Sequence, residues 1–154
     1  MEQHPELSVI ICTLDRQEDL CLTLASLQRQ RAEGDWEVLV VDNGSTDGSP
    51  EAAAAMEEGF QVPFRLETEP RRGLSFGRNT ALELARGEAV LFLDDDVNCR
   101  PGLVDGHLQA FRIPDVLATA GRILPLMPPE TPPWFYELLE DEVPRRGAAR
   151  AALQ

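Results

Sequence analysis

The stretch Leu7–Thr13, LSVIICT, decides the fold class, because a continuous apolar, β-branched run is typical of a strand buried on both faces. A segment of helical period follows at residues 16–29, with Leu20, Leu24 and Leu27 on one face and Asp15 and Glu18 as a capped start. Strand-like runs recur at 36–41, 62–67 and 88–93, with helical segments from about 49 and 75 between them. This alternation predicts an α/β fold, a three-layer α/β/α sandwich around a mainly parallel sheet.

The chain changes character near residue 126. Before it, a helix is expected from Pro101 and a strand over residues 116–123. After it, repeated prolines predict an irregular connector, and the Arg- and Ala-rich end has little to bury. We therefore expect one folded domain at 1–126, followed by a Pro-rich connector with a loosely ordered tail at 127–154.

Composition narrows the class of protein. The net charge is −13, from 27 acidic against 14 basic residues, all of them Arg, which argues against nucleic acid as a partner. No apolar run approaches the roughly 20 residues that span a bilayer, and the acidic, polar start does not resemble a signal peptide. Three scattered cysteines fit reduced thiols. A cytoplasmic protein is expected, with peripheral membrane contact through a partner left open.

Acidic residues follow the predicted strands, where ligands of open α/β sheets bind. Asp15 follows the first strand, Asp42 ends the second, and residues 94–96, DDD, follow the fourth. Three adjacent carboxylates repel one another unless a cation or several donors compensate them, and Mg²⁺ or Mn²⁺ suits such oxygen ligands. A solvated acidic turn is the alternative explanation.

Four ordered motifs resemble family 2 glycosyltransferases, over about residues 7–126. They are LSVIICT at 7–13, VVDNGSTDG at 40–48, RGLSFGRN at 72–79 and LFLDDD at 91–96. One such motif alone is weak, whereas four in order at compatible spacing are specific. The resemblance implies the Rossmann-like nucleotide-diphospho-sugar transferase fold of the GT-A type, with a nucleotide-sugar donor as partner.

The resemblance also implies a base pocket. In the family, the carboxylate after the second strand, here Asp42, accepts a hydrogen bond from the nucleotide base, commonly uracil. Thr13 and Asp15 would line the same pocket. The alternatives remain open: Asp42 can simply build a turn, and Thr13 and Asp15 can cap the first helix.

The acidic run resembles the family's D-x-D motif. Asp96 is then the expected ligand of Mn²⁺ or Mg²⁺, while Asp94 and Asp95 contact the ribose or the metal shell. Arg78 resembles a position near the nucleotide and would offset diphosphate charge, although a surface ion pair is equally open.

The implied reaction is metal-assisted transfer of a sugar from a nucleotide sugar, commonly a UDP-sugar, to an acceptor hydroxyl with inversion. It needs a general base, which in the family lies in a Glu-Asp motif well after the D-x-D motif. Asp141 is a weak candidate because it comes early, so the natural domain is expected to continue beyond residue 154. The motifs do not indicate whether the acceptor is a saccharide, a lipid or a protein glycoconjugate.

The second most favoured function is that of a non-catalytic nucleotide-sugar-binding module or an inactive fragment. A dinucleotide-binding oxidoreductase is disfavoured, since residues 13–16, TLDR, contain no glycine.

Overall fold

A computed structural model describes residues 4–125, 130–132 and 134. Contacts divide the chain into Met1–Ala120 and Gly121–Gln154, and the folded elements lie in the first unit. Its sheet has four strands in the order β3-β2-β1-β4, all parallel. The strands are β1 (Leu7–Thr13), β2 (Trp36–Asp42), β3 (Phe64–Thr68) and β4 (Ala89–Leu93).

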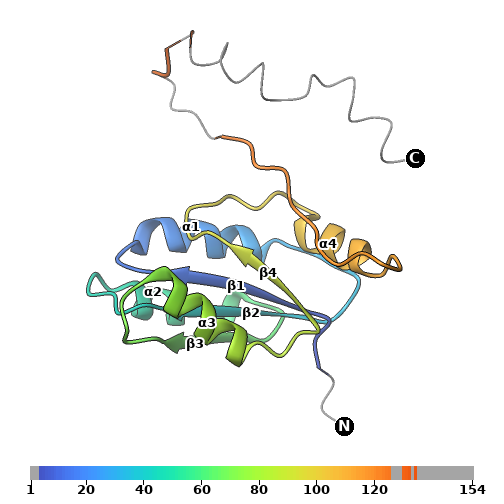
Figure 1. Cartoon of the computed structure of the whole chain (residues 1–154). Helices are drawn as coiled ribbons and strands as arrows, with labels where there is room; N and C mark the ends of the chain where they lie inside the picture. Colours follow the sequence, from blue (N-terminus) through green and yellow to red (C-terminus); the bar gives the residue numbers. More distant parts are fainter. Residues whose placement is uncertain (1–3, 126–129, 133, 135–154) are drawn as a thin grey trace. The chain divides into compact units, whose positions relative to one another are not determined.

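Helices cover both faces of this sheet (Figure 1). They are α1 (Gln17–Gln28), α2 (Ser49–Ala55), the short 3-10 helix η1 (Glu57–Gly59), α3 (Leu74–Leu84) and α4 (Leu103–Phe111). Alternation along β1 separates two cores, because successive side chains of a strand point to opposite faces. Val9 and its like-facing neighbours pack with apolar residues of α1, α2 and α4, whereas Ile10 packs with Ala81 of α3. The predicted three-layer α/β/α fold with a parallel sheet is confirmed.

One predicted element is wrong. Residues 116–125 form neither strand nor helix, although 116–123 was expected to be a strand. A strand needs a neighbour for its N–H and C=O groups, and within the described residues the sheet consists of the four strands above. Apolar pattern alone does not supply that neighbour.

The start of α1 also differs from expectation. Asp15 does not cap the helix; its backbone is left-handed, with φ 51°, and its carboxylate accepts the N–H of Thr46 instead. The N–H of Gln17, in the first turn of α1, has no acceptor within the helix and donates to Asp47 Oδ2 at 2.9 Å. The side chain that caps α1 therefore comes from the loop after β2. Its hydrogen bond connects the loop after β1 with the loop after β2.

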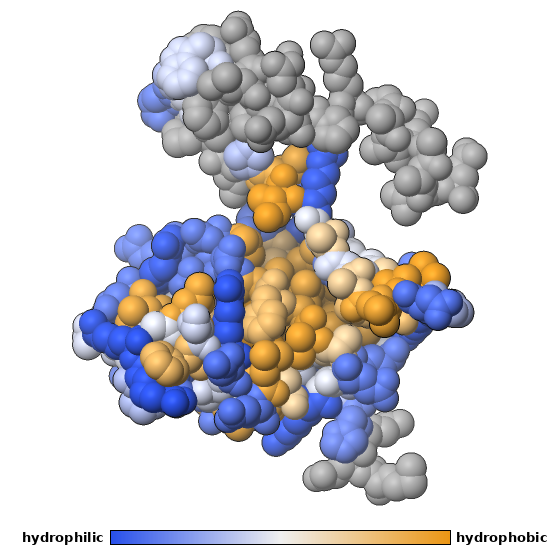
Figure 2. Space-filling model, in the orientation of Figure 1, coloured by the Kyte–Doolittle hydropathy of each residue, from blue (hydrophilic) through white to orange (hydrophobic). Residues whose placement is uncertain are grey.

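Strand β4 forms one edge of the described sheet and carries no charged residue. Its burial is incomplete, because Phe92 is 37% exposed. Leu82 on α3 is 50% exposed as well. Figure 2 shows apolar surface gathered on the face where β4 lies in Figure 1. None of the helices among the described residues is long and apolar enough to cross a bilayer.

Candidate functional site

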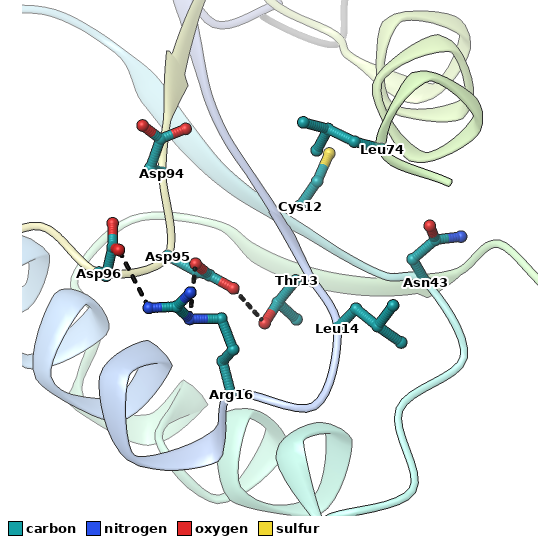
Figure 3. Close-up of a pocket in the computed structure, with 9 residues that line it drawn as sticks. All are labelled: Cys12, Thr13, Leu14, Arg16, Asn43, Leu74, Asp94, Asp95 and Asp96. Carbon is teal, nitrogen blue, oxygen red and sulfur yellow. Dashed lines mark hydrogen bonds and ion pairs between the residues drawn. The ribbon is translucent and has the colours of Figure 1, made fainter. Parts of the chain in front are cut away.

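The site lies at the carboxyl ends of β1, β2 and β4, which parallel pairing brings to one edge of the sheet. Thr13 pairs with Asp42, and Ile11 pairs with Leu93, the last residue of β4. The Asp94–Asp96 run therefore begins beside the end of β1. A cavity of about 340 Å³ opens there (Figure 3). It is lined by Cys12, Thr13, Leu14, Arg16, Asn43, Leu74, Asp94, Asp95 and Asp96.

Asp95 is the most enclosed of the three acids, with its side chain 12% exposed. The Thr13 hydroxyl donates to its Oδ2 at 2.7 Å, linking the ends of β1 and β4. Burial raises the pKa of Asp95, and the Thr13 hydrogen bond and the Arg16 charge oppose that rise. The turn is also held from α1, where the Thr23 hydroxyl donates to the Asp95 carbonyl and accepts the Val97 N–H.

Arg16 supplies the positive charge of the acidic cluster, a role the sequence analysis missed. Its Nε lies 3.4 Å from Asp95 Oδ1, and its Nη2 lies 3.0 Å from Asp96 Oδ2. Figure 3 shows the guanidinium placed between the two carboxylates. The same Nη2 also lies 3.0 Å from Asp19 on α1. The sequence did offer one signal for this role, because Arg16 is the single basic residue in the short loop after the first strand.

Asp94 and Arg78 form a separate, more exposed pair. The Asp94 side chain is 69% exposed, and its Oδ1 is 3.7 Å from Arg78 Nη2. The Arg78 guanidinium also lies over the Phe92 ring, 5.7 Å from its centroid. Asp94 lines the cavity, but Arg78 is not one of its lining residues. Exposed pairs of this kind contribute little to stability, so the contact between Arg78 and Asp94 is broken at low cost.

Asp42, the last residue of β2, and Asp15, in the loop after β1, do not line the cavity. Asp42 is buried, and its carboxylate accepts the N–H groups of Gly44 and Ser45 at 3.1 and 3.2 Å. The N–H of Asp15 donates to Ser45 Oγ at 2.9 Å. The Asp42 carboxylate thus accepts hydrogen bonds from the loop after β2, and the Asp15 carboxylate accepts the Thr46 N–H from the same loop. Their contact with a nucleotide base stays a prediction.

Asn43 is a second residue that the sequence analysis did not single out. It is buried, and its Nδ2 donates to the carbonyls of Glu69 and Arg71 at 2.9 and 2.7 Å. Its Oδ1 accepts the Gly73 N–H at 2.7 Å. One side chain therefore fixes the loop before α3 and brings Leu74 to the cavity wall. An Asn within a run of turn formers has no sequence signal for such long-range contacts.

The acidic cluster suits a small divalent cation in number and chemistry. Within the described part of the chain, no group of three or more His, Cys, Asp or Glu side chains is arranged as a ready-made metal cage. Asp95 and Asp96 instead offer two carboxylates that share one positive partner. Mg²⁺ and Mn²⁺ are commonly held by one or two carboxylates together with water and substrate phosphate. The two acids therefore fit such an ion when phosphate is also present.

Asp141, the candidate general base, lies outside the described residues.

The chain is an α/β protein with a parallel sheet and an acid-lined cavity at the carboxyl edge of that sheet. Residues 8–143 match the family described as Glycosyl transferase family 2. The chain belongs to that family, and the resemblance drawn from the four motifs is confirmed.

Related proteins agree with this assignment. The uncharacterized glycosyltransferase YfnE of Bacillus subtilis is 36% identical over 138 residues, which are 88% of this chain and 33% of YfnE. The chain thus spans about a third of that relative's length.

Two solved structures share the fold. The mannosyltransferase PcManGT of Pyrobaculum calidifontis, in complex with GDP-Man and Mn²⁺, has a TM-score of 0.56 and 34% identity over 62% of this chain and 28% of its own. Staphylococcus aureus TarS 1-349, in complex with UDP, has a TM-score of 0.54 and 31% identity over 59% of this chain and 27% of its own.

Proposed function

We propose that this chain is the donor-binding part of a glycosyltransferase that transfers a sugar from a nucleoside diphosphate sugar to an acceptor hydroxyl with inversion. The observation that carries the proposal is the meeting of Thr13, Asp95, Asp96 and Arg16 in one cavity at the carboxyl edge of the sheet. UDP is the proposed nucleotide. The bound UDP of TarS and the bound GDP-Man and Mn²⁺ of PcManGT support a nucleoside diphosphate donor and a divalent cation.

The proposed roles follow from position. Asp42, at the end of β2, and Asp15, in the loop after β1, recognise the nucleotide base. Asp96 holds Mn²⁺ or Mg²⁺, and Asp95, oriented by Thr13, completes the carboxylate pair. When bound, the cation supplies positive charge that stabilises the departing diphosphate. Asp94 contacts the ribose or the metal shell, and Arg78, half-exposed beside it, offsets phosphate charge.

Transfer requires a base that takes the proton of the acceptor hydroxyl. Asp141 remains the candidate, outside the described residues. The second candidate function is therefore a donor-binding module without transfer activity, because every role that the described residues support concerns the donor. The acceptor, peripheral membrane contact and the cytoplasmic location remain expectations.

Calorimetric titration of UDP tests the donor site. We expect UDP to bind in the presence of Mn²⁺, and binding to be lost in EDTA and in Asp96→Ala. Metal-dependent release of sugar from UDP-sugars would then favour the enzyme over the binding module. An Asp96→Ala variant that binds UDP as the wild type does in Mn²⁺ would exclude Asp96 as the metal ligand, and failure of every nucleoside diphosphate to bind would overturn the proposed function.

A further inference from the structure

The two carboxylates that are proposed to bind the divalent cation are already paired with a positively charged side chain, the guanidinium of Arg16. It contacts Asp95 and Asp96 at once, at 3.4 and 3.0 Å. An arginine guanidinium stays protonated in proteins, so this positive charge beside the cluster is permanent. A divalent ion that uses both carboxylates therefore meets a positive charge on the side where Arg16 lies (Figure 3).

We propose that Arg16 is the resident counter-ion of the acidic cluster and that a divalent cation must displace it to bind. This inference rests on the proposed function. Three properties of Arg16 suit it to this exchange.

First, the guanidinium is accessible, since the Arg16 side chain is 45% exposed and the Asp96 side chain 48% exposed. Solvent-exposed ion pairs are weak and easily broken. Second, a long side chain that begins one residue before α1 can move without disturbing the helix.

Third, Arg16 keeps a partner after displacement. Its Nη2 already contacts Asp19, in the first turn of α1, at 3.0 Å. Displacement therefore breaks the contacts with Asp95 and Asp96 and retains the contact with Asp19. Asp95 keeps its Thr13 hydrogen bond throughout, so one carboxylate stays oriented while the other gains freedom.

The test compares Mn²⁺ affinity by calorimetry in the whole chain without nucleotide. Arg16→Gln should bind Mn²⁺ about three- to tenfold more tightly than wild type, the effect of removing the ion pair with the half-exposed Asp96 and the ion pair with the more enclosed Asp95. The matched control is Arg29→Gln, which removes the same charge at the other end of α1, where the Arg29 side chain donates to the Ala25 carbonyl. The affinity of Arg29→Gln for Mn²⁺ should differ from that of the wild type by less than twofold.

A second variant acts in the opposite direction. Asp19→Asn removes the partner that receives Arg16 after displacement, so Mn²⁺ should bind more weakly than to wild type. Glu18→Gln, one residue away with the same charge change, is its control. Equal or weaker Mn²⁺ binding by Arg16→Gln, with the wild type still binding, would overturn the inference while leaving the metal site intact.

A spectroscopic measurement is independent of affinity. In protein with ¹⁵N-labelled arginine, the Nε–H signal of Arg16 should shift on titration with diamagnetic Mg²⁺, while that of Arg29 should stay in place. If the Arg16 signal is unchanged when Mg²⁺ saturates the protein, no displacement occurs. Absence of Mn²⁺ and Mg²⁺ binding in wild type and Arg16→Gln alike would overturn both this inference and the metal site, whereas UDP binding reports on the donor site separately.

Discussion

The Thr13 hydroxyl donates to Asp95 Oδ2 at 2.7 Å, across 82 residues of sequence. This contact ties the end of β1 to the turn after β4 and orients the most enclosed carboxylate of the site. Because Asp95 is buried there, its carboxylate depends on the few donors that reach it. The site and the fold are therefore stabilised by the same hydrogen bond.

We expect Thr13→Val to lower the free energy of unfolding by about 1–3 kcal/mol, the cost of leaving a buried polar group without its donor. Valine keeps the shape and the β propensity of threonine, so the loss reports on the hydroxyl. Urea denaturation measures the change. Thr13→Ser retains a hydroxyl and should recover most of the stability; an equal loss in both variants would assign the effect to packing of the methyl group.

Asn43→Ala should destabilise the chain by about 2–4 kcal/mol, because three hydrogen bonds of roughly 1 kcal/mol each are lost at a buried position. The loop before α3 should also become mobile, which protease cleavage near Arg71 and Arg72 would detect. Asn98→Ala, an exposed change of the same kind, is the control and should stay within about 0.5 kcal/mol of wild type. Equal stability of the two variants would contradict the role given to Asn43.

Glu69 should make the stability of the folded chain sensitive to acid. Hydrogen bonds from the Arg71 side chain and the Thr80 hydroxyl, together with the Arg71 N–H, lower its pKa from 4.5 to about 2. The unfolded carboxyl takes up a proton near pH 4.5, whereas the folded one does not. The stabilisation is therefore complete above pH 4.5 and is lost as the pH falls toward about 2.

In Glu69→Gln the free energy of unfolding should consequently fall less steeply with acid over that pH range. Urea denaturation across the range measures the slope. Glu58→Gln, at an exposed position on η1, should keep the wild-type slope. Identical slopes in wild type and Glu69→Gln would show that Glu69 does not titrate abnormally.

Glu37 is a buried carboxylate within β2, only 1% exposed, and Arg65 Nη1 lies 3.3 Å from its Oε2. Arg65→Met should destabilise the fold by about 3–5 kcal/mol, because it leaves a buried charge without its cation. In a Glu37→Gln background the same change should cost clearly less. A double-mutant cycle by urea denaturation measures the coupling, and additive effects would show that the two side chains act independently.

The strands and helices up to residue 111 were largely predictable from the sequence, because burial on both faces of a parallel sheet gives continuous apolar runs such as that of β1. Element bounds agree to within about one to four residues, an ordinary error for sequence patterns. The strand expected at 116–123 was wrong, since an apolar pattern carries no information about whether a pairing partner exists.

The sequence by itself placed acids at the carboxyl edge of the sheet, because residues that follow parallel strands must emerge at one edge. Of these acids, Asp94, Asp95 and Asp96 line the cavity, whereas Asp15 and Asp42 do not. The sequence did not determine how they are held. Only the tertiary structure decided that Asp47 caps α1, that Asn43 fixes the loop before α3, and that Arg16 lies between Asp95 and Asp96. Each of these contacts joins side chains from separate loops, and their geometry depends on how strands distant in sequence are placed side by side.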